Sequence, residues 1–196
     1  MADYHVQEYV REMNQAAVKL AREVADEYTA LNPDKPRFVA GSVGPTNKTC
    51  SMSPDVNNPA YRAVTYDEMA DAYQQQMEAM LESGVDALLI ETIFDTLNAK
   101  AAILAAERAM KATGVKVPVM LSVTVSDTGG RTLSGQTLEA FLASVQHADI
   151  FSVGLNCSFG ARQLKPFLEQ LAARAPYYIS AVSYTHLRAH ETRSNL

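Results

Sequence analysis

Apolar runs of strand length recur along the chain, with amphipathic, helix-length stretches between them. The runs begin near Phe38, Asp86, Pro118, Ile150 and Tyr177. The intervals from 86 to 118 and from 118 to 150 are both 32 residues long. Such intervals suit β-α units, and continuous apolar strands are typical of a parallel sheet covered on both faces. The spacing therefore predicts an α/β domain.

Two architectures are built from repeated β-α units: a doubly wound open sheet and a (β/α)8 TIM barrel. The sequence contains neither a Gly-x-Gly-x-x-Gly dinucleotide-binding motif nor a Walker-type phosphate loop, which favours the barrel. Five strands in 196 residues are too few for a complete barrel of about 250 residues. We expect an incomplete TIM barrel over residues 1–182. The polar segment 183–196 interrupts the pattern, and we expect it to be a non-native tail.

Helix boundaries are legible in several places. Thr65 and Glu68 have capping-box spacing and predict a helix over about 66–83. The next helix should begin at Asp95 or Thr96. Near the N-terminus, apolar residues recur every three or four positions, which predicts a long helix whose apolar stripe packs on the core. That stripe contains Val6, Val10, Met13, Ala17, Leu20, Val24, Tyr28 and Leu31.

Composition narrows the range of partners and compartments. Seventeen Lys and Arg against 22 Asp and Glu give a formal charge of -5, which argues against nucleic acid. No run approaches the roughly 20 apolar residues of a membrane span, and the N-terminus lacks the features of a signal peptide. We therefore expect no membrane partner and a cytoplasmic location. In that reducing compartment Cys50 and Cys157 are expected to be free thiols.

The reactive residues of parallel β/α folds lie at the carboxyl ends of the strands. Glu91 ends the run Ala-Leu-Leu-Ile-Glu, where a half-buried carboxylate needs a cation or hydrogen-bond donors to remain ionised. A bound ammonium group would satisfy it, and so would a salt bridge to a neighbouring Lys or Arg. The residue alone leaves both interpretations open.

Cys157 follows Gly-Leu-Asn at another predicted strand end. There a thiol can act as a nucleophile or a metal ligand, although an inert buried thiol is the usual state of a single cysteine. One cysteine cannot hold zinc, which takes about four ligands. Cys50 lies in a polar loop without metal-ligand spacing around it, and we take it as incidental.

Five segments together resemble one known family. They are Phe38–Thr49 (FVAGSVGPTNKT), Ser53–Pro59 (SPDVNNP), Ile90–Ala101 (IETIFDTLNAKA), Gly130–Thr137 (GRTLSGQT) and Gly154–Cys157 (GLNC). They resemble the homocysteine-binding barrel of the cobalamin-dependent methionine synthases, and the likeness runs from about Ala2 to Ala181. Other homocysteine methyltransferases are expected to share the Gly-x-Asn-Cys strand end without the Ser53–Pro59 and Phe94–Lys100 segments.

The resemblance implies transfer of a methyl group from methylcobalamin to the sulfur of homocysteine, forming methionine. It implies zinc held by three cysteine thiolates, with the substrate sulfur as the fourth ligand. Cys157 matches the first of these thiolates, and Glu91 matches the carboxylate that receives the substrate ammonium group. Asn156, and less surely Ser122, fall where polar groups would line the substrate. No catalytic residue is assigned.

The sequence departs from this family at both ends. The opening Asp-Gly-Gly-Met-Gly-type motif is absent, and so is the Gly-Gly-Cys-Cys motif that carries the other two zinc ligands. The folate and cobalamin domains, which would be partners in the full-length parent, are absent as well. We therefore expect a fragment, truncated at both ends, that neither holds zinc in the family manner nor turns over by itself.

Two alternatives belong to other functional classes. A metal-free, cysteine-dependent barrel enzyme would need a base near Cys157, and the only histidines outside the tail are His5 and His147, both in predicted helical segments. A non-catalytic interaction fragment would bind a partner through the long N-terminal helix.

Overall fold

The computed structural model describes residues 1–157 and 159–182, so the expected tail at 183–196 lies outside the described residues. Helices and strands alternate after short 3-10 turns at Ala2–Tyr4 and Gln7–Tyr9. The elements are α1 (Val10–Leu31), β1 (Ala40–Val43), α2 (Tyr66–Glu82), β2 (Ala87–Ile93), α3 (Thr96–Thr113), β3 (Val119–Val123), α4 (Leu138–Val145), β4 (Ser152–Asn156), α5 (Ala161–Arg174) and β5 (Tyr178–Val182).

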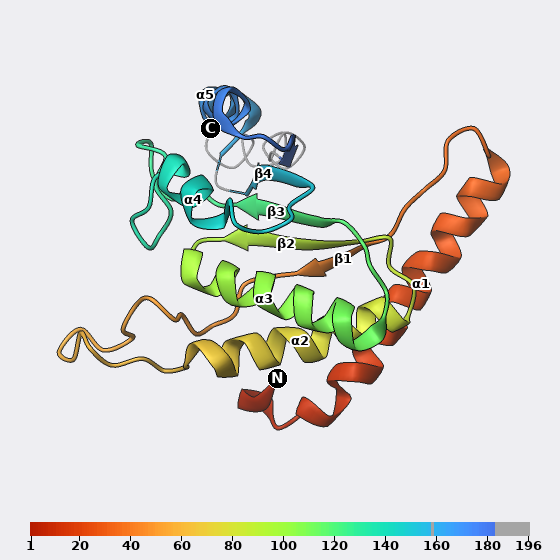
Figure 1. The fold of residues 1–196 in the computed structure, drawn as a ribbon, viewed down its shortest axis with the longest axis horizontal. Helices are drawn as coiled ribbons and strands as arrows, with labels where there is room; N and C mark the ends of the chain where they lie inside the picture. The colour runs from red at the N-terminus through yellow and green to blue at the C-terminus, as the bar shows by residue number, and fades with distance from the viewer. Residues whose placement is uncertain (158, 183–196) are drawn as a thin grey trace, which may run out of the picture.

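The five strands form one parallel sheet in the order β1-β2-β3-β4-β5. Figure 1 shows the strands side by side, with α2 and α3 lying along one face. Val43, Ile90, Leu121 and Val153 occupy one row of the register, and all four are buried. The incomplete barrel is confirmed, and each strand begins within two residues of its expected position.

Helix packing explains why the sheet forms. Alanines at six positions of α3 are buried, and their small side chains allow α3 to lie close to both α2 and the sheet. These are Ala99, Ala101, Ala102, Ala105, Ala106 and Ala109. Thr65 and Glu68 form the predicted capping box at the start of α2, and Asp95 caps α3. Both helix starts are therefore fixed by local sequence.

The prediction that the apolar stripe of α1 packs on the core is wrong. Leu20 and Leu31 are 66% and 74% exposed, and Val18 and Ala25 are the buried residues of this helix instead. Ion pairs from Arg11 to Glu82 and from Arg22 to Asp86 fasten α1 with its apolar stripe outward. The reason is geometric, because α2 contacts only one face of α1 and no other described element covers the stripe.

Every helix in the described ranges is too short or too polar to cross a lipid bilayer.

Candidate functional site at the carboxyl ends of the strands

The carboxyl end of β2 departs from regular strand geometry. Its register with β3 shifts between Ile90 and Ile93, and Thr92 adopts a left-handed backbone with φ 57°. A bulge of this kind re-aims side chains, and a β-branched residue at positive φ is a strained conformation. The irregularity lies at Glu91 and Thr92, and this departure from regular strand geometry makes the end of β2 a candidate functional position.

Glu91 is half-buried and receives hydrogen bonds from side chains of β1 and β4. Ser42 Oγ of β1 donates to Glu91 Oε1 at 2.5 Å, and Asn156 Nδ2 of β4 lies 3.5 Å from Oε2. Glu91 forms no ion pair with any described residue. Of the two sequence interpretations, the salt bridge is therefore not found, and the carboxylate can accept a cation from outside.

Asn156 links three strand ends through one buried amide. Its Oδ1 accepts from the Thr92 N–H at 3.1 Å and from Ser122 Oγ at 2.8 Å. Its Nδ2 donates to Thr92 Oγ1 at 2.7 Å and to Cys157 Sγ at 3.2 Å. With only 2% of Asn156 exposed, these bonds direct the amide toward protein groups. The Asn156 amide thus lies between Glu91 and Cys157, and Ser122 helps to orient it.

Cys157 stands directly after β4 on the same rim as Glu91. It is half-buried, and it also has a left-handed backbone with φ 57°. The Asn156 amide contacts both the Cys157 sulfur and the Glu91 carboxylate, so the structure brings together all the predicted site residues, Ser122 included. At this rim the carboxylate can accept a cationic group, and the thiol can act as a nucleophile or supply one metal ligand.

Cys50 occupies a separate environment. Its side chain is buried, and its N–H donates to Asn98 Oδ1 at 2.8 Å. Burial raises the pKa of the Cys50 thiol, and the nearby Asp95 carboxylate raises it further. A thiol kept protonated in this way is a poor nucleophile or metal ligand.

Sequence reasoning missed three residues that hold the site. Ser42 and Thr92 were visible only as strand-end positions, because their hydrogen bonds depend on the register of the sheet. Asn98 lies within the first turn of α3, where it meets the loop after β1. The sequence signal for Asn98 was its position three residues after the helix cap Asp95, where a polar side chain can bond to a neighbouring backbone.

The described residues do not fit a complete zinc site. No group of three or more His, Cys, Asp or Glu among them could hold a metal ion. Cys157 could supply one ligand of such a site, and the described residues do not supply the others.

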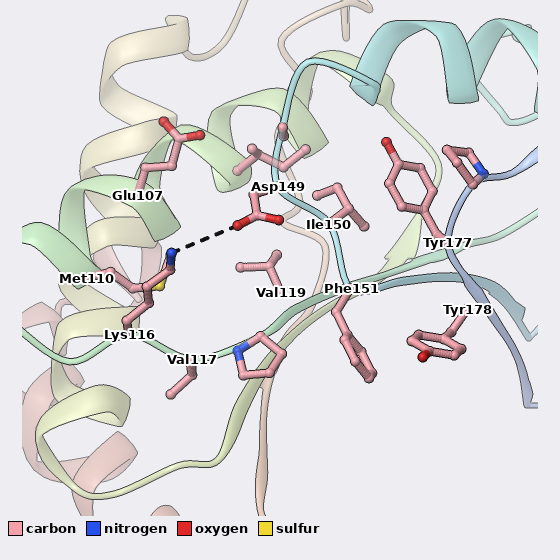
Figure 2. Close-up of a pocket in the computed structure, with 14 residues that line it drawn as sticks. Glu107, Met110, Lys116, Val117, Val119, Asp149, Ile150, Phe151, Tyr177 and Tyr178 are labelled. Carbon is pink, nitrogen blue, oxygen red and sulfur yellow. Dashed lines mark ion pairs between the residues drawn. The ribbon is translucent and has the colours of Figure 1, made fainter.

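A hollow lies at the amino ends of the strands, opposite to the end that carries Glu91 and Cys157 (Figure 2). It has a volume of about 750 Å³, and Lys116 and Asp149 form an ion pair at 4.0 Å across it. The rings of Phe151 and Tyr178 lie 5.0 Å apart at its edge. This hollow is at the amino ends of the strands, where conserved chemistry of β/α barrels is not built. We therefore place the candidate site at the other end.

The sequence profile of the homocysteine S-methyltransferase family matches residues 1–193. The chain belongs to the homocysteine S-methyltransferase family. Among solved structures, it is similar to the apo form of the homocysteine methyltransferase MmuM from Escherichia coli, at 22% identity and a TM-score of 0.69. That match covers 93% of this chain and 63% of MmuM.

The metallated form of Escherichia coli MmuM matches at 21% identity and a TM-score of 0.66, covering 87% of this chain and 57% of that one. This homocysteine S-methyltransferase chain thus spans less than two thirds of these two structures. At such identities the likeness establishes the shared fold.

Proposed function

We propose that this chain carries the homocysteine-binding part of a methyltransferase that methylates the homocysteine sulfur to give methionine. The observation that carries the proposal is the half-buried Glu91 carboxylate, which lacks a cationic partner among the described residues and is joined to Cys157 through Asn156. Residues 1–182 form the homocysteine-binding unit in this proposal, and 183–196 a non-native tail.

Glu91 binds the ammonium group of homocysteine, while Ser42 and Asn156 fix the orientation of the carboxylate. A charge-assisted bond to a partly desolvated carboxylate is stronger than a neutral one and so favours an amino acid over an uncharged thiol. The sulfur must lose its proton before it attacks, because the thiolate is the nucleophile. A new S–C bond then forms as the bond between the methyl group and its donor breaks.

We further propose Cys157 as one zinc ligand, with the remaining thiolates supplied by residues that this 196-residue sequence does not contain. When bound, zinc would lower the pKa of the substrate thiol. Since the whole sequence has only two cysteines and Cys50 is buried elsewhere, we expect the 196-residue chain to bind homocysteine without turnover.

The motifs at 53–59 and 94–100 support a methionine synthase in particular. With that assignment we propose methylcobalamin as the methyl donor, folate and cobalamin domains as partners in the full-length parent, and a cytoplasmic role in methionine biosynthesis.

A binding experiment tests the central claim. Calorimetry under reducing conditions should detect L-homocysteine binding to the chain, and Glu91→Gln should weaken it about tenfold, since it removes a charge-assisted bond. Asp71→Asn is the matched control, because it makes the same charge change on an exposed carboxylate of α2. The wild type should also prefer homocysteine to 4-mercaptobutanoate, which lacks the ammonium group. Absence of binding, or equal affinity in Glu91→Gln, would contradict the proposal.

The alternatives are weaker. A metal-free cysteine enzyme would need a base beside Cys157, but the described neighbour of the Cys157 sulfur is the Asn156 amide, and His147 lies before β4, at the far end of the sheet. The outward stripe of α1 favours an interaction fragment, yet that function leaves the polar cluster at the strand ends unexplained.

A further inference from the structure

Two buried polar side chains at the start of α3 hold the loop that follows β1. Asp95 and Asn98 are only 2% and 6% exposed. Asp95 Oδ1 caps the helix by accepting from the Leu97 N–H at 2.9 Å. Its other oxygen, Oδ2, accepts from Ser51 through the N–H at 3.1 Å and through Oγ at 2.6 Å. One carboxylate therefore serves both the helix and the loop.

The side chain of Asn98 forms hydrogen bonds with the backbone of the same loop. Asn98 Oδ1 accepts from the Cys50 N–H at 2.8 Å, and Nδ2 donates to the Lys48 carbonyl at 3.0 Å. Buried backbone groups outside helices and strands need such partners. The contacts use main-chain atoms of the loop, so they fix its path whatever its side chains are.

The loop runs from residue 44 to residue 65 without a helix or strand. Loops of this length inside compact domains are usually functional. Figure 1 shows it extending past the carboxyl ends of the strands, the end that carries Glu91. Its position is therefore relevant to whatever binds there.

The first residues of the loop lie against the carboxylate site. Gly44 and Pro45 line a small hollow together with Glu91, Asp95 and Asn98. Just before them, Ser42 donates to Glu91. The loop thus begins next to Glu91, at Gly44 and Pro45, and residues 48–51 are bound to the start of α3, so the path of segment 44–51 is fixed at both ends.

We propose that Asp95 and Asn98 are positioning residues that hold segment 44–51 as one wall of the homocysteine site and thereby set the affinity for the amino acid end of the substrate. This role rests on the proposed function. Both residues act through the loop, since neither contacts Glu91 through a hydrogen bond.

Conservative substitutions separate this role from helix capping. In Asp95→Asn the amide oxygen can still cap α3, because Asn caps as well as Asp. The amide NH2, however, cannot accept from the Ser51 N–H, so this backbone donor loses its partner, while the Ser51 hydroxyl can reverse its bond and accept. In Asn98→Asp the Cys50 contact is kept, while a carboxylate oxygen opposes the Lys48 carbonyl.

Each variant should bind homocysteine about tenfold more weakly and be cut about tenfold faster by trypsin after Lys48 and Arg62, the effect of one lost buried hydrogen bond. Ser51→Ala is a milder variant that removes one donor and should shift both readouts in the same direction. Added to Asp95→Asn, it should cause little further loss, because the two residues act as a pair.

Thr137→Ala is the control. It removes the cap of α4, which Thr137 provides by accepting from the Ala140 N–H at 3.2 Å, without touching the loop. It should lower the melting temperature but leave homocysteine affinity unchanged, as any merely structural change would. If the wild type binds homocysteine and both Asp95→Asn and Asn98→Asp bind it equally well, the positioning role is overturned and the proposed function stands. A wild-type chain that binds no homocysteine overturns the proposed function and this role with it.

Discussion

Asn156→Ala probes whether one buried amide really holds the strand ends together. The substitution removes the acceptor for the Thr92 N–H and for the Ser122 hydroxyl, and the donor to Thr92 Oγ1. Ser122 is buried and Thr92 half-buried, so water cannot fully replace the lost partners. Each buried polar group left unpaired costs about 1–3 kcal/mol.

We therefore expect Asn156→Ala to lower the free energy of unfolding by about 2–4 kcal/mol, a large share of the roughly 5–15 kcal/mol of an ordinary domain. Urea unfolding followed by circular dichroism measures it, provided that the denaturant slope is unchanged. Asn47→Ala is the matched control, since Asn47 is exposed and donates only to Asp3 at 2.8 Å. It should cost less than about 0.5 kcal/mol. A loss below about 1 kcal/mol in Asn156→Ala would refute the reasoning.

Four further predictions concern single side chains. Thr65→Ala should destabilise the protein by about 1 kcal/mol through loss of the α2 cap, measured by urea unfolding. The Thr65 N–H and hydroxyl lower the pKa of Glu68 below its ordinary 4.5, so its contribution is present above that pH, and the stability gap to Glu68→Gln should narrow as the pH falls below 4.5. Ellman's reagent should label Cys157 in the native protein and Cys50 only after unfolding; equal rates would contradict the assigned burial. Burial raises the pKa of Tyr73 to about 12, so an ultraviolet titration should show Tyr73 ionising last, with that last step absent in Tyr73→Phe and stability lost as pH rises from about 10 toward 12.

The fold was largely predictable because its signals are local. The capping box at Thr65 and the Asp95 cap need only a few neighbouring residues, and apolar runs of strand length placed all five strands. The apolar stripe of α1 misled the prediction, because periodicity identifies an apolar face but not what lies opposite it. Leu20 is exposed since no described element reaches that side.

The candidate site was predictable in part. Glu91 and Cys157 stood out as unusual residues at strand ends, and the register of parallel strands brings such ends to one rim. The hydrogen bonds of Ser42 and Asn98 could not be predicted, because each joins segments about 50 residues apart. The Ser42 bond depends on the register of β1 with β2, and the Asn98 bond on the folded path of the loop after β1.

At Thr92 and Cys157 a strained backbone conformation lowers the stability of the fold, while the two side chains form part of the candidate site. Glycine adopts a φ of 57° without the steric penalty that other residues bear, so a selection for heat resistance alone would favour glycine at both positions. Such a selection would delete the half-buried Cys157 thiol and the Thr92 hydroxyl that holds the Asn156 amide. Engineering a more robust version of this chain therefore calls for changes elsewhere, with these two strained residues left as they are.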